Sequence, residues 1–583
     1  MNYLFIASLA FILLSYSNFI NLIFKTKLNE TFLITICSII IFSYFILKLD
    51  IYFNLFILNY IFLIILILAF LLLPIIIKNN SKINKKLNLE FLFIFLLIFF
   101  LSKERYYLDE DEFSYWGLAL KNLTLRADGF DFSHHPDGLN LFRNLFNFFE
   151  YKEGNIIFSN NIILISGFYY LFYDRKLTFL EKFFLFAIYY LLLNNLSFGF
   201  LSIYSDPVLA IIYACLLKKS YFIFKDENSS KEINFLFILI TLLLINRSAP
   251  IYAIFIFYLC LSLFFLNSYN KQKTGIGLFI LAFIISVLFI ILIFPNLNHN
   301  YPAFVRYYFE ILFYSNILTE QLIDFFLAPI YFSHFGVTLN SIFEILFSTT
   351  YKLFEFQIPV ISYVVFLSLF MFFKFKHKRF IITSSLLIIV TYMIIILILK
   401  IELENLNLLA VPRYIGIMIL AKFLFLISIV TFYNKSIHNN YILLFLLFSL
   451  FIITPKKTFG FVVPNKIYYS DLSNYNFKKN RDKINMLRDF KNNFDNIIVI
   501  HKKNYSDYTN NSVAGYHTFY HSIIKYETFP KKVSFIEYKK YLSIQDSFSQ
   551  TDSLFVLFDL SLNEISKINN NNNFFEINTY IKK

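Results

Sequence analysis

The sequence predicts an all-α polytopic membrane protein with about 12–14 transmembrane helices, followed by a small C-terminal α/β domain outside the membrane. Of the 583 residues, 58% are hydrophobic and 15% are charged, whereas a soluble domain carries roughly 25% charged residues. Many apolar runs approach the ~20 residues that cross the hydrocarbon core of a bilayer. Residues 465–583, in contrast, are polar and contain no such run.

The apolar runs give the expected helices in chain order. They cover residues 3–24, 31–48, 51–77, 91–102 with flanks, 156–173, 183–199, 276–294, 380–399 and 440–453 with flanks. Two further runs, 200–217 and 234–266, are interrupted by Asp206 and Arg247, and we interpret the second run as two helices. The first run lacks the basic segment and cleavage site of a signal peptide, so it counts as a helix.

The charges of the loops predict the orientation. Loop 78–90 carries four lysines and one acid, and loop 374–379 carries four basic residues and no acid, so both are expected in the cytoplasm. Alternating helices then place loop 103–155, loop 295–356 and the chain after about residue 454 on the outer side. We therefore expect an integral protein of the bacterial inner membrane with its C-terminal domain on the periplasmic side. The net charge of +14 is explained by these loops, and no nucleic acid partner is expected.

The composition divides the chain into three expected domains. Residues 1–90 hold N-terminal transmembrane helices, 91–455 form the transmembrane core with outer loops 103–155 and 295–356, and 456–583 form the soluble domain. In this soluble domain, 495–503 and 553–560 each contain a short apolar run that is typical of a buried strand. Residues 480–494 and 561–568 are expected to be helices, and the asparagine run 569–573 a loop.

An acidic motif directly follows the expected helix that ends at residue 102. It consists of Asp109, Glu110, Asp111 and Glu112. Residues 112–123 then have helical spacing, which predicts a helix in the membrane interface with Phe113, Trp116, Leu120 and Leu123 on one face. Clustered carboxylates raise one another's pKa or bind a cation, which suits a general base. The alternative is a solvated acidic loop with an interfacial anchor.

Further polar residues are expected on the same outer side. They are His134, His135, Asp206, Arg247, Arg413 and Tyr414. The two histidines could bind a metal or a phosphate, or could simply shape a turn beside Pro136. Ionisable residues at a membrane are costly and are therefore functional candidates, although an arginine at a helix end can also extend to the interface. Arginine grips phosphate with its planar guanidinium.

Together these residues match the needs of sugar transfer from a lipid phosphate. Such a reaction requires a base for the acceptor hydroxyl and positive charge for the leaving phosphate. The acids of the motif would serve as the base, and Arg413 or Arg247 would bind the phosphate. A divalent metal ion is the one cofactor that the acids and histidines suggest.

These motifs resemble those of the C-type (GT-C) membrane glycosyltransferase superfamily, which includes protein mannosyltransferases and the aminoarabinose transferase of lipid A. The resemblance rests on the motif 111–117 (Asp-Glu-Phe-Ser-Tyr-Trp-Gly), on His135-Pro136, on Arg413-Tyr414 and on a C-terminal outer domain. The motif 111–117 is similar to that of an uncharacterised bacterial subgroup with Asp-Glu-Phe-Ser-x-Trp-Gly. The resemblance covers roughly residues 90–455.

The resemblance implies an inverting glycosyltransferase that uses a polyprenyl-phosphate sugar donor and a lipid, glycan or protein acceptor in cell-envelope biosynthesis. It assigns the base or metal-ligand role to Asp111 and Glu112, with Asp109 and Glu110 as substitutes. Three departures stand out: about three extra helices precede the acidic loop, 135–138 reads His-Pro-Asp-Gly instead of Tyr-Pro-Pro-Gly, and Pro412 replaces an acid.

Two other functions remain open. A surface-polysaccharide polymerase or ligase would use arginine and histidine in a large outer loop, and Arg306, Glu310 and His334 in loop 295–356 fit that pattern. A transporter or flippase would place polar residues at the bilayer midplane and repeat its halves. The apolar runs here are mostly unbroken, and the halves differ from each other.

Overall fold

The computed structural model describes part of the 583-residue chain. The described residues are 3–24, 26–53, 57–79, 84–103, 105, 107, 117–125, 138–148, 151–173, 179–196, 200, 203, 206–225, 337–338, 355–356, 420–429, 431, 484–487, 493–494, 496–501, 521, 523–528, 531–544, 553–558, 560, 562–568 and 573–577. Contacts divide the chain into a helical unit (Met1–Glu104 and Asp131–Thr458) and a C-terminal unit (Arg105–Phe130 and Phe459–Lys583).

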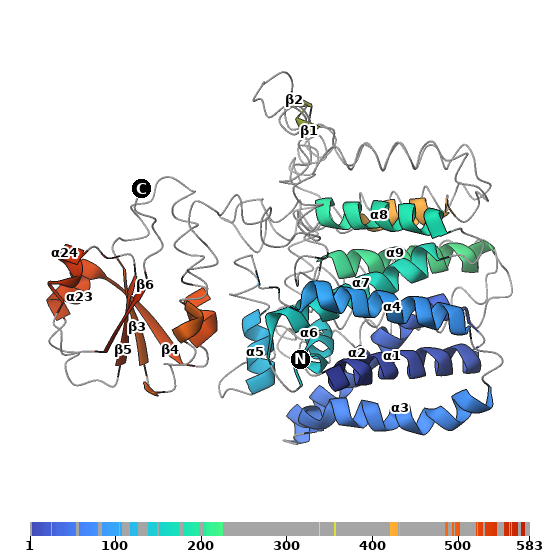
Figure 1. Ribbon diagram of the computed structural model, residues 1–583, viewed down its shortest axis with the longest axis horizontal. Helices are drawn as coiled ribbons and strands as arrows, with labels where there is room; N and C mark the ends of the chain where they lie inside the picture. Colours follow the sequence, from blue (N-terminus) through green and yellow to red (C-terminus); the bar gives the residue numbers. More distant parts are fainter. Residues whose placement is uncertain are drawn as a thin grey trace, which may run out of the picture. The chain divides into compact units, whose positions relative to one another are not determined.

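The helical unit is built from long, nearly parallel helices that lie side by side (Figure 1). Its helices include α1 (Tyr3–Phe24), α2 (Leu28–Phe53), η1 (Ile57–Tyr60), α3 (Ile61–Lys78), α4 (Lys85–Ser102), α6 (Gly138–Leu145), α7 (Glu153–Phe172), α8 (Phe179–Leu196) and α9 (Asp206–Lys225). A shorter apolar helix, Leu420–Ile429, also belongs to this unit. A short antiparallel pair, β1 (Val337–Thr338) and β2 (Glu355–Phe356), also falls in this unit.

The helical unit contains membrane-spanning helices. Within the described residues, four segments are long and apolar enough to cross a bilayer: α1, Leu28–Leu47 of α2, α3 and α7. The chain is therefore an integral membrane protein, and the predicted fold class is confirmed as a mostly helical chain with a small C-terminal α/β domain. The expected helices within 234–266, 276–294, 380–399 and 440–453 lie outside the described residues, so the total of about 12–14 remains a prediction.

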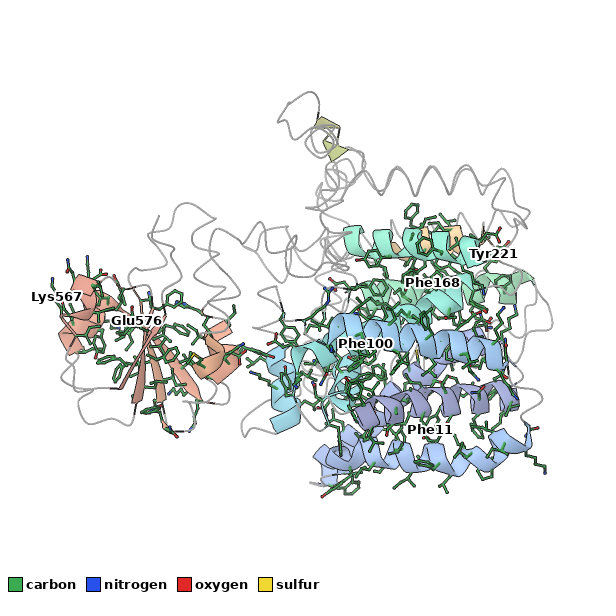
Figure 2. All side chains as sticks on the ribbon, viewed as in Figure 1. Phe11, Phe100, Phe168, Tyr221, Lys567 and Glu576 are labelled. Carbon is green, nitrogen blue, oxygen red and sulfur yellow. The ribbon has the colours of Figure 1, made fainter. Side chains whose placement is uncertain are left out.

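Helix α7 forms the centre of this unit, and α3 lies at its rim. Every residue of α7 is buried, against α2, α4 and α9. Aromatic side chains fill much of the interior (Figure 2), as with Phe168 of α7, whose ring centroid lies 5.2 Å from that of Phe186. Helix α3 instead exposes large apolar side chains such as Ile67 and Leu71, as expected of a surface that faces lipid.

Two glycines of α7 allow close helix contacts. A Cβ added to Gly154 would lie 2.5 Å from the carbonyl oxygen of Lys103 and 2.6 Å from that of Ser102, at the end of α4. A Cβ on Gly167 would lie 2.2 Å from Cγ2 of Ile211 on α9. Small residues at such crossings let helix backbones approach closely in a membrane, where packing drives association.

Polar contacts join helix ends that the predicted topology places on one side. Lys219, near the end of α9, pairs with Glu30, near the start of α2, at 3.0 Å. Lys182 of α8 lies 3.5 Å from the carboxylate of Glu90 in α4, which also accepts a hydrogen bond of 2.9 Å from the Tyr173 hydroxyl. The helices therefore alternate in direction, and the outward orientation of the opposite end remains a prediction.

One helix boundary agrees with the sequence-based expectation and another differs from it. The run 200–217 was expected to be interrupted at Asp206, and α9 does begin at this residue, where a carboxylate favours the helix N-terminus and Pro207 fits the first turn. The run 51–77 is not one helix, because α2 continues to Phe53 and η1 precedes α3. The Asp50 carboxylate accepts a hydrogen bond from the Ile57 amide at 2.9 Å across this break.

The C-terminal unit contains a parallel sheet. Among its described residues, β3 (Asn496–His501), β4 (Lys532–Glu537), β5 (Ser553–Phe558) and β6 (Asn573–Ile577) pair in the order β4-β3-β5-β6. The strands expected at 495–503 and 553–560 are β3 and β5. Strands β4 and β6 were not expected, and β6 begins at Asn573, inside the asparagine run that we expected to be a loop.

Alternating residues of the strands build two buried faces. Ile500 and Phe555 face α23 (Tyr538–Ile544) and α24 (Leu562–Ile565), which lie on the same side of the sheet (Figure 1). On the other face, the ring of His521 lies 4.1 Å from Phe535 of β4 and 5.7 Å from Phe558 of β5, between ring centroids. The helical residues 523–528 follow His521, so the unit has helices on both faces of the sheet.

Candidate functional site

Among the site residues predicted from the sequence, the structure describes Asp206. The others lie outside the described residues: Asp109, Glu110, Asp111, Glu112, His134, His135, Arg247, Arg413 and Tyr414, together with Arg306, Glu310 and His334 of the alternative function. The structure does describe what flanks the acidic motif, and it adds two polar clusters that sequence reasoning missed.

The flanks of the acidic motif belong to the C-terminal unit. Helix α5 (Gly117–Leu125) follows the motif, and its Leu120 and Leu123 are buried, as the helical spacing predicts. The Lys121 side chain of α5 donates a hydrogen bond to the carbonyl oxygen of Tyr526 and lies 3.8 Å from the Glu527 carboxylate. Helix α5 thus packs on the C-terminal unit, and its location in the membrane interface remains a prediction.

The other flank makes a related contact. Tyr107, just before the motif, is fully buried, and its ring centroid lies 5.7 Å from that of Tyr526. The Lys121 ammonium lies 3.5 Å from the centroid of the same Tyr526 ring. Both ends of the segment that carries the acidic motif therefore contact one residue of the C-terminal unit.

A buried arginine organises one end of the helical unit. Arg143 of α6 is fully buried, and its guanidinium donates hydrogen bonds to Asn140 Oδ1 (2.9 Å), to Asn160 Oδ1 of α7 (3.1 Å) and to the carbonyl oxygen of Ile203 (2.6 Å). Asp206, which is 4% exposed, begins α9 three residues after Ile203. A charged donor that binds three acceptors from separate elements fixes their relative positions.

Buried amides extend this cluster along α7. The Asn161 side-chain amide donates to the Ser102 hydroxyl at 3.0 Å, while its Oδ1 is buried with no hydrogen-bond partner in the described part of the chain. Asn147 Oδ1 accepts a hydrogen bond of 3.2 Å from the Lys152 amide. The end of α4, the first half of α7 and α6 thus share a buried polar layer.

The apolar side of α6 closes this layer toward α1 and α3. Phe142, Leu145 and Phe146 line an apolar cavity of about 10 Å³ together with side chains of α1, α2 and α3. That volume is about what one water molecule needs, and apolar cavities stay dry. The cavity therefore has no room for an isoprenoid chain, and α6 is firmly packed into the helical unit.

The C-terminal unit contains a buried histidine pair. The ring centroids of His501, at the end of β3, and His521 lie 5.3 Å apart, and both side chains are buried. Burial, and then the nearby His501 and Lys525, lower the pKa of His521 from 6.5 to about 3. His521 is therefore neutral at physiological pH and serves as an uncharged packing residue against Phe535.

Metal ligands do not converge in the described part of the chain. No group of three or more His, Cys, Asp or Glu side chains there could hold a metal ion. A divalent ion at Asp109–Glu112 is therefore an expectation from sequence alone.

Comparisons with known proteins supply no relative. No protein-family model, no curated protein and no solved structure matches the chain.

Proposed function

We propose that the chain is a glycosyltransferase that moves a sugar from a polyprenyl-phosphate-linked donor to a lipid, glycan or protein acceptor at the outer face of the membrane. One observation carries the proposal. The acidic motif 109–112 lies between Tyr107 and α5, and both of these flanks are buried in the C-terminal unit next to Tyr526. A segment of acids whose two ends are fixed is suited to general-base work, which depends on geometry.

The chemistry is a single displacement. The acceptor hydroxyl attacks the anomeric carbon, its proton passes to a carboxylate of Asp111 or Glu112, and the bond between the sugar and the lipid phosphate breaks. The configuration of the sugar is thereby inverted, and the phosphate leaves with the electron pair of that bond. Membrane helices are required because the polyprenyl tail of the donor stays in the bilayer.

The remaining predicted residues have supporting roles. Arg413, Tyr414 and Arg247 would bind the donor phosphate and stabilise its growing negative charge. A further group would assist as acids or metal ligands: Asp109, Glu110, His134, His135 and Asp206. Of these, Asp206 is buried at the start of α9, close in the chain to the Ile203 carbonyl that binds Arg143.

A transporter or flippase is the second candidate, and a specific observation favours it. Asn160 and Asn161 lie well inside α7, and a transporter is expected to bury polar groups within its membrane helices. These amides already bond to Arg143 and to Ser102, which also fits a structural role. Substrate flux in proteoliposomes without any sugar transfer would favour this candidate.

Two variants test the proposed site. In nanodiscs, Asp111→Asn should lower sugar transfer by roughly 10²–10⁴-fold, the usual contribution of a general base, while the protein remains folded and inserted. Arg413→Ala should raise the donor concentration needed for half-maximal rate, through lost phosphate contact. Lys540→Met, an exposed change on α23, is the control that should leave transfer unaffected. Normal transfer by both site variants would remove the proposed site.

A further inference from the structure

Tyr526 contacts both ends of the segment that carries the acidic motif. The ring of Tyr107 lies 5.7 Å from the Tyr526 ring, between centroids, and the ammonium of Lys121 lies 3.5 Å from the same ring centroid. Lys121 also donates to the Tyr526 carbonyl and pairs with Glu527 at 3.8 Å. All four residues belong to the C-terminal unit, although Lys121 and Tyr526 are 405 positions apart in the chain.

This set of contacts is shielded from water. Tyr107, Tyr526 and Glu527 are fully buried, and Lys121 is 6% exposed. A cation over an aromatic ring is more strongly held when it is desolvated. Removing one partner of a buried ion pair takes the opposite charge away from the other partner in a desolvated site, so the pair is costly to break from either side.

The helical residues 523–528 are themselves held against the sheet. Ile523 and Ile524 are fully buried, and His521 at the start of this segment contacts Phe535 of β4. Lys525, on the same helical segment, places its ammonium 5.3 Å from the Phe535 ring centroid. The segment is therefore packed on one side by the sheet and contacts Tyr107 and α5 through Tyr526, which makes it a rigid support.

We propose that Tyr526, Glu527 and Lys121 are positioning residues that make the C-terminal unit the support of the acidic segment. Fixing both ends of a chain segment to one residue lowers the number of conformations open to it. Catalytic groups need such support to stay in productive geometry. The inference rests on the proposed function for its catalytic consequence, but the anchoring itself can be measured without any substrate.

The test uses the full-length protein in nanodiscs. Lys121→Met and Glu527→Gln each remove one partner of the ion pair, and the double variant removes both charges. Lys540→Met on α23 is the matched control, because it removes an exposed lysine of the same unit. Amide hydrogen exchange is followed in peptides that cover α5 and, separately, in peptides that cover β3 and β5.

Lys121→Met should speed exchange in α5 by about tenfold or more, because α5 loses its contacts with Tyr526 and the buried Glu527 carboxylate loses its opposite charge. Exchange in β3 and β5 should change by less than about twofold, since local opening leaves the rest of the unit protected. The double variant should exchange more slowly in α5 than either single variant, because it leaves neither charge of the pair buried without the opposite one. In a transfer assay, Lys121→Met should lower kcat about tenfold and leave the KM for donor unchanged.

Three results would overturn the inference. Unchanged exchange in α5 would mean that these contacts do not anchor it. An equal increase in β3 and β5 would mean that Lys121 supports the whole unit and not the segment. A normal kcat despite faster exchange would separate anchoring from catalysis. A wild-type protein without transfer activity would count against the proposed function, and the exchange data would still decide the anchoring.

Discussion

Replacing Arg143 by methionine should destabilise the helical unit strongly. The change removes hydrogen bonds to Asn140, to Asn160 and to the Ile203 carbonyl. Bonds to a charged donor contribute roughly 1.5–3 kcal/mol each. The variant also removes the cost of burying the charge, so we expect a net loss of about 3–5 kcal/mol, mainly because three buried acceptors lose their donor at roughly 1–3 kcal/mol each. Total stabilities of roughly 5–15 kcal/mol make this a large fraction.

The helical unit contains its own probes for the assay. Cys37 of α2 and Cys215 of α9 are free thiols and both are fully buried, so a thiol-reactive dye labels them when these helices open. Thermal unfolding of the protein in detergent, followed by this dye, should occur at a clearly lower temperature for Arg143→Met than for wild type.

Two further variants sharpen this prediction. Arg143→Met combined with Asn160→Leu should restore at least about 1 kcal/mol of the lost free energy of unfolding, because the buried acceptor that loses the Arg143 donor is removed as well. Lys85→Met, at an exposed position of α4, is the control, and its free energy of unfolding should stay within about 0.5 kcal/mol of the wild-type value. If the free energy of unfolding of Arg143→Met lies within about 1 kcal/mol of the wild-type value, the buried hydrogen bonds do not hold α6 and α7 together and the reasoning is refuted.

Two other predictions concern packing and pH. Gly154→Ala should lower the free energy of unfolding by about 1–3 kcal/mol in the same dye assay. The added Cβ would meet the backbone carbonyls of Ser102 and Lys103, which no change of side-chain rotamer can move. An unchanged melting temperature would contradict the close contact. For His521, the folded pKa of about 3 lies below the unfolded value of 6.5. Protons therefore bind the unfolded chain first, and stability is lost as pH falls from 6.5 toward 3, by about 1.4 kcal/mol per pH unit at most. Amide protection of β3 and β5 should fall with pH along this slope, and His521→Phe should make the slope smaller. The same slope in wild type and variant would exclude His521 as the cause of the pH dependence.

Strong local patterns predicted much of the fold. The apolar run 3–24 is α1, because a run of that length is typical of a membrane-spanning helix. The apolar residues of 553–560 form β5, because a short continuous apolar run is typical of a buried strand. Strands β4 and β6 were missed because both lie at the edges of the sheet, where exposed positions hold charged residues such as Lys532 and Glu576 and weaken the apolar signal.

The helix break near Asp50 depends on a hydrogen bond. Its carboxylate binds the Ile57 amide, and a scan for apolar runs does not register such a local contact. Polar side chains that bond to nearby backbone can end a helix inside an otherwise continuous apolar stretch.

The polar clusters were harder to foresee for two physical reasons. Lys121 and Tyr526 are far apart in the chain, and no local pattern predicts which distant residue a buried lysine will meet. Arg143 lies within loop 103–155 of the predicted topology, where a single arginine carries no pattern of its own. A signal was present: Asn140, Arg143 and Asn147 share one face of a helical turn pattern, opposite Phe142 and Phe146.

The central claim is most directly tested by sugar transfer itself. Purified protein in nanodiscs would be incubated with radiolabelled polyprenyl-phosphate sugars and a membrane-lipid extract as acceptor source, beside the Asp111→Asn variant. A glycosyltransferase predicts label in a new product with wild type and little or none with the variant. Equal labelling by both proteins would contradict the assignment of the base. No transfer from any donor, together with substrate flux in proteoliposomes, would contradict the enzymatic function and favour a transporter.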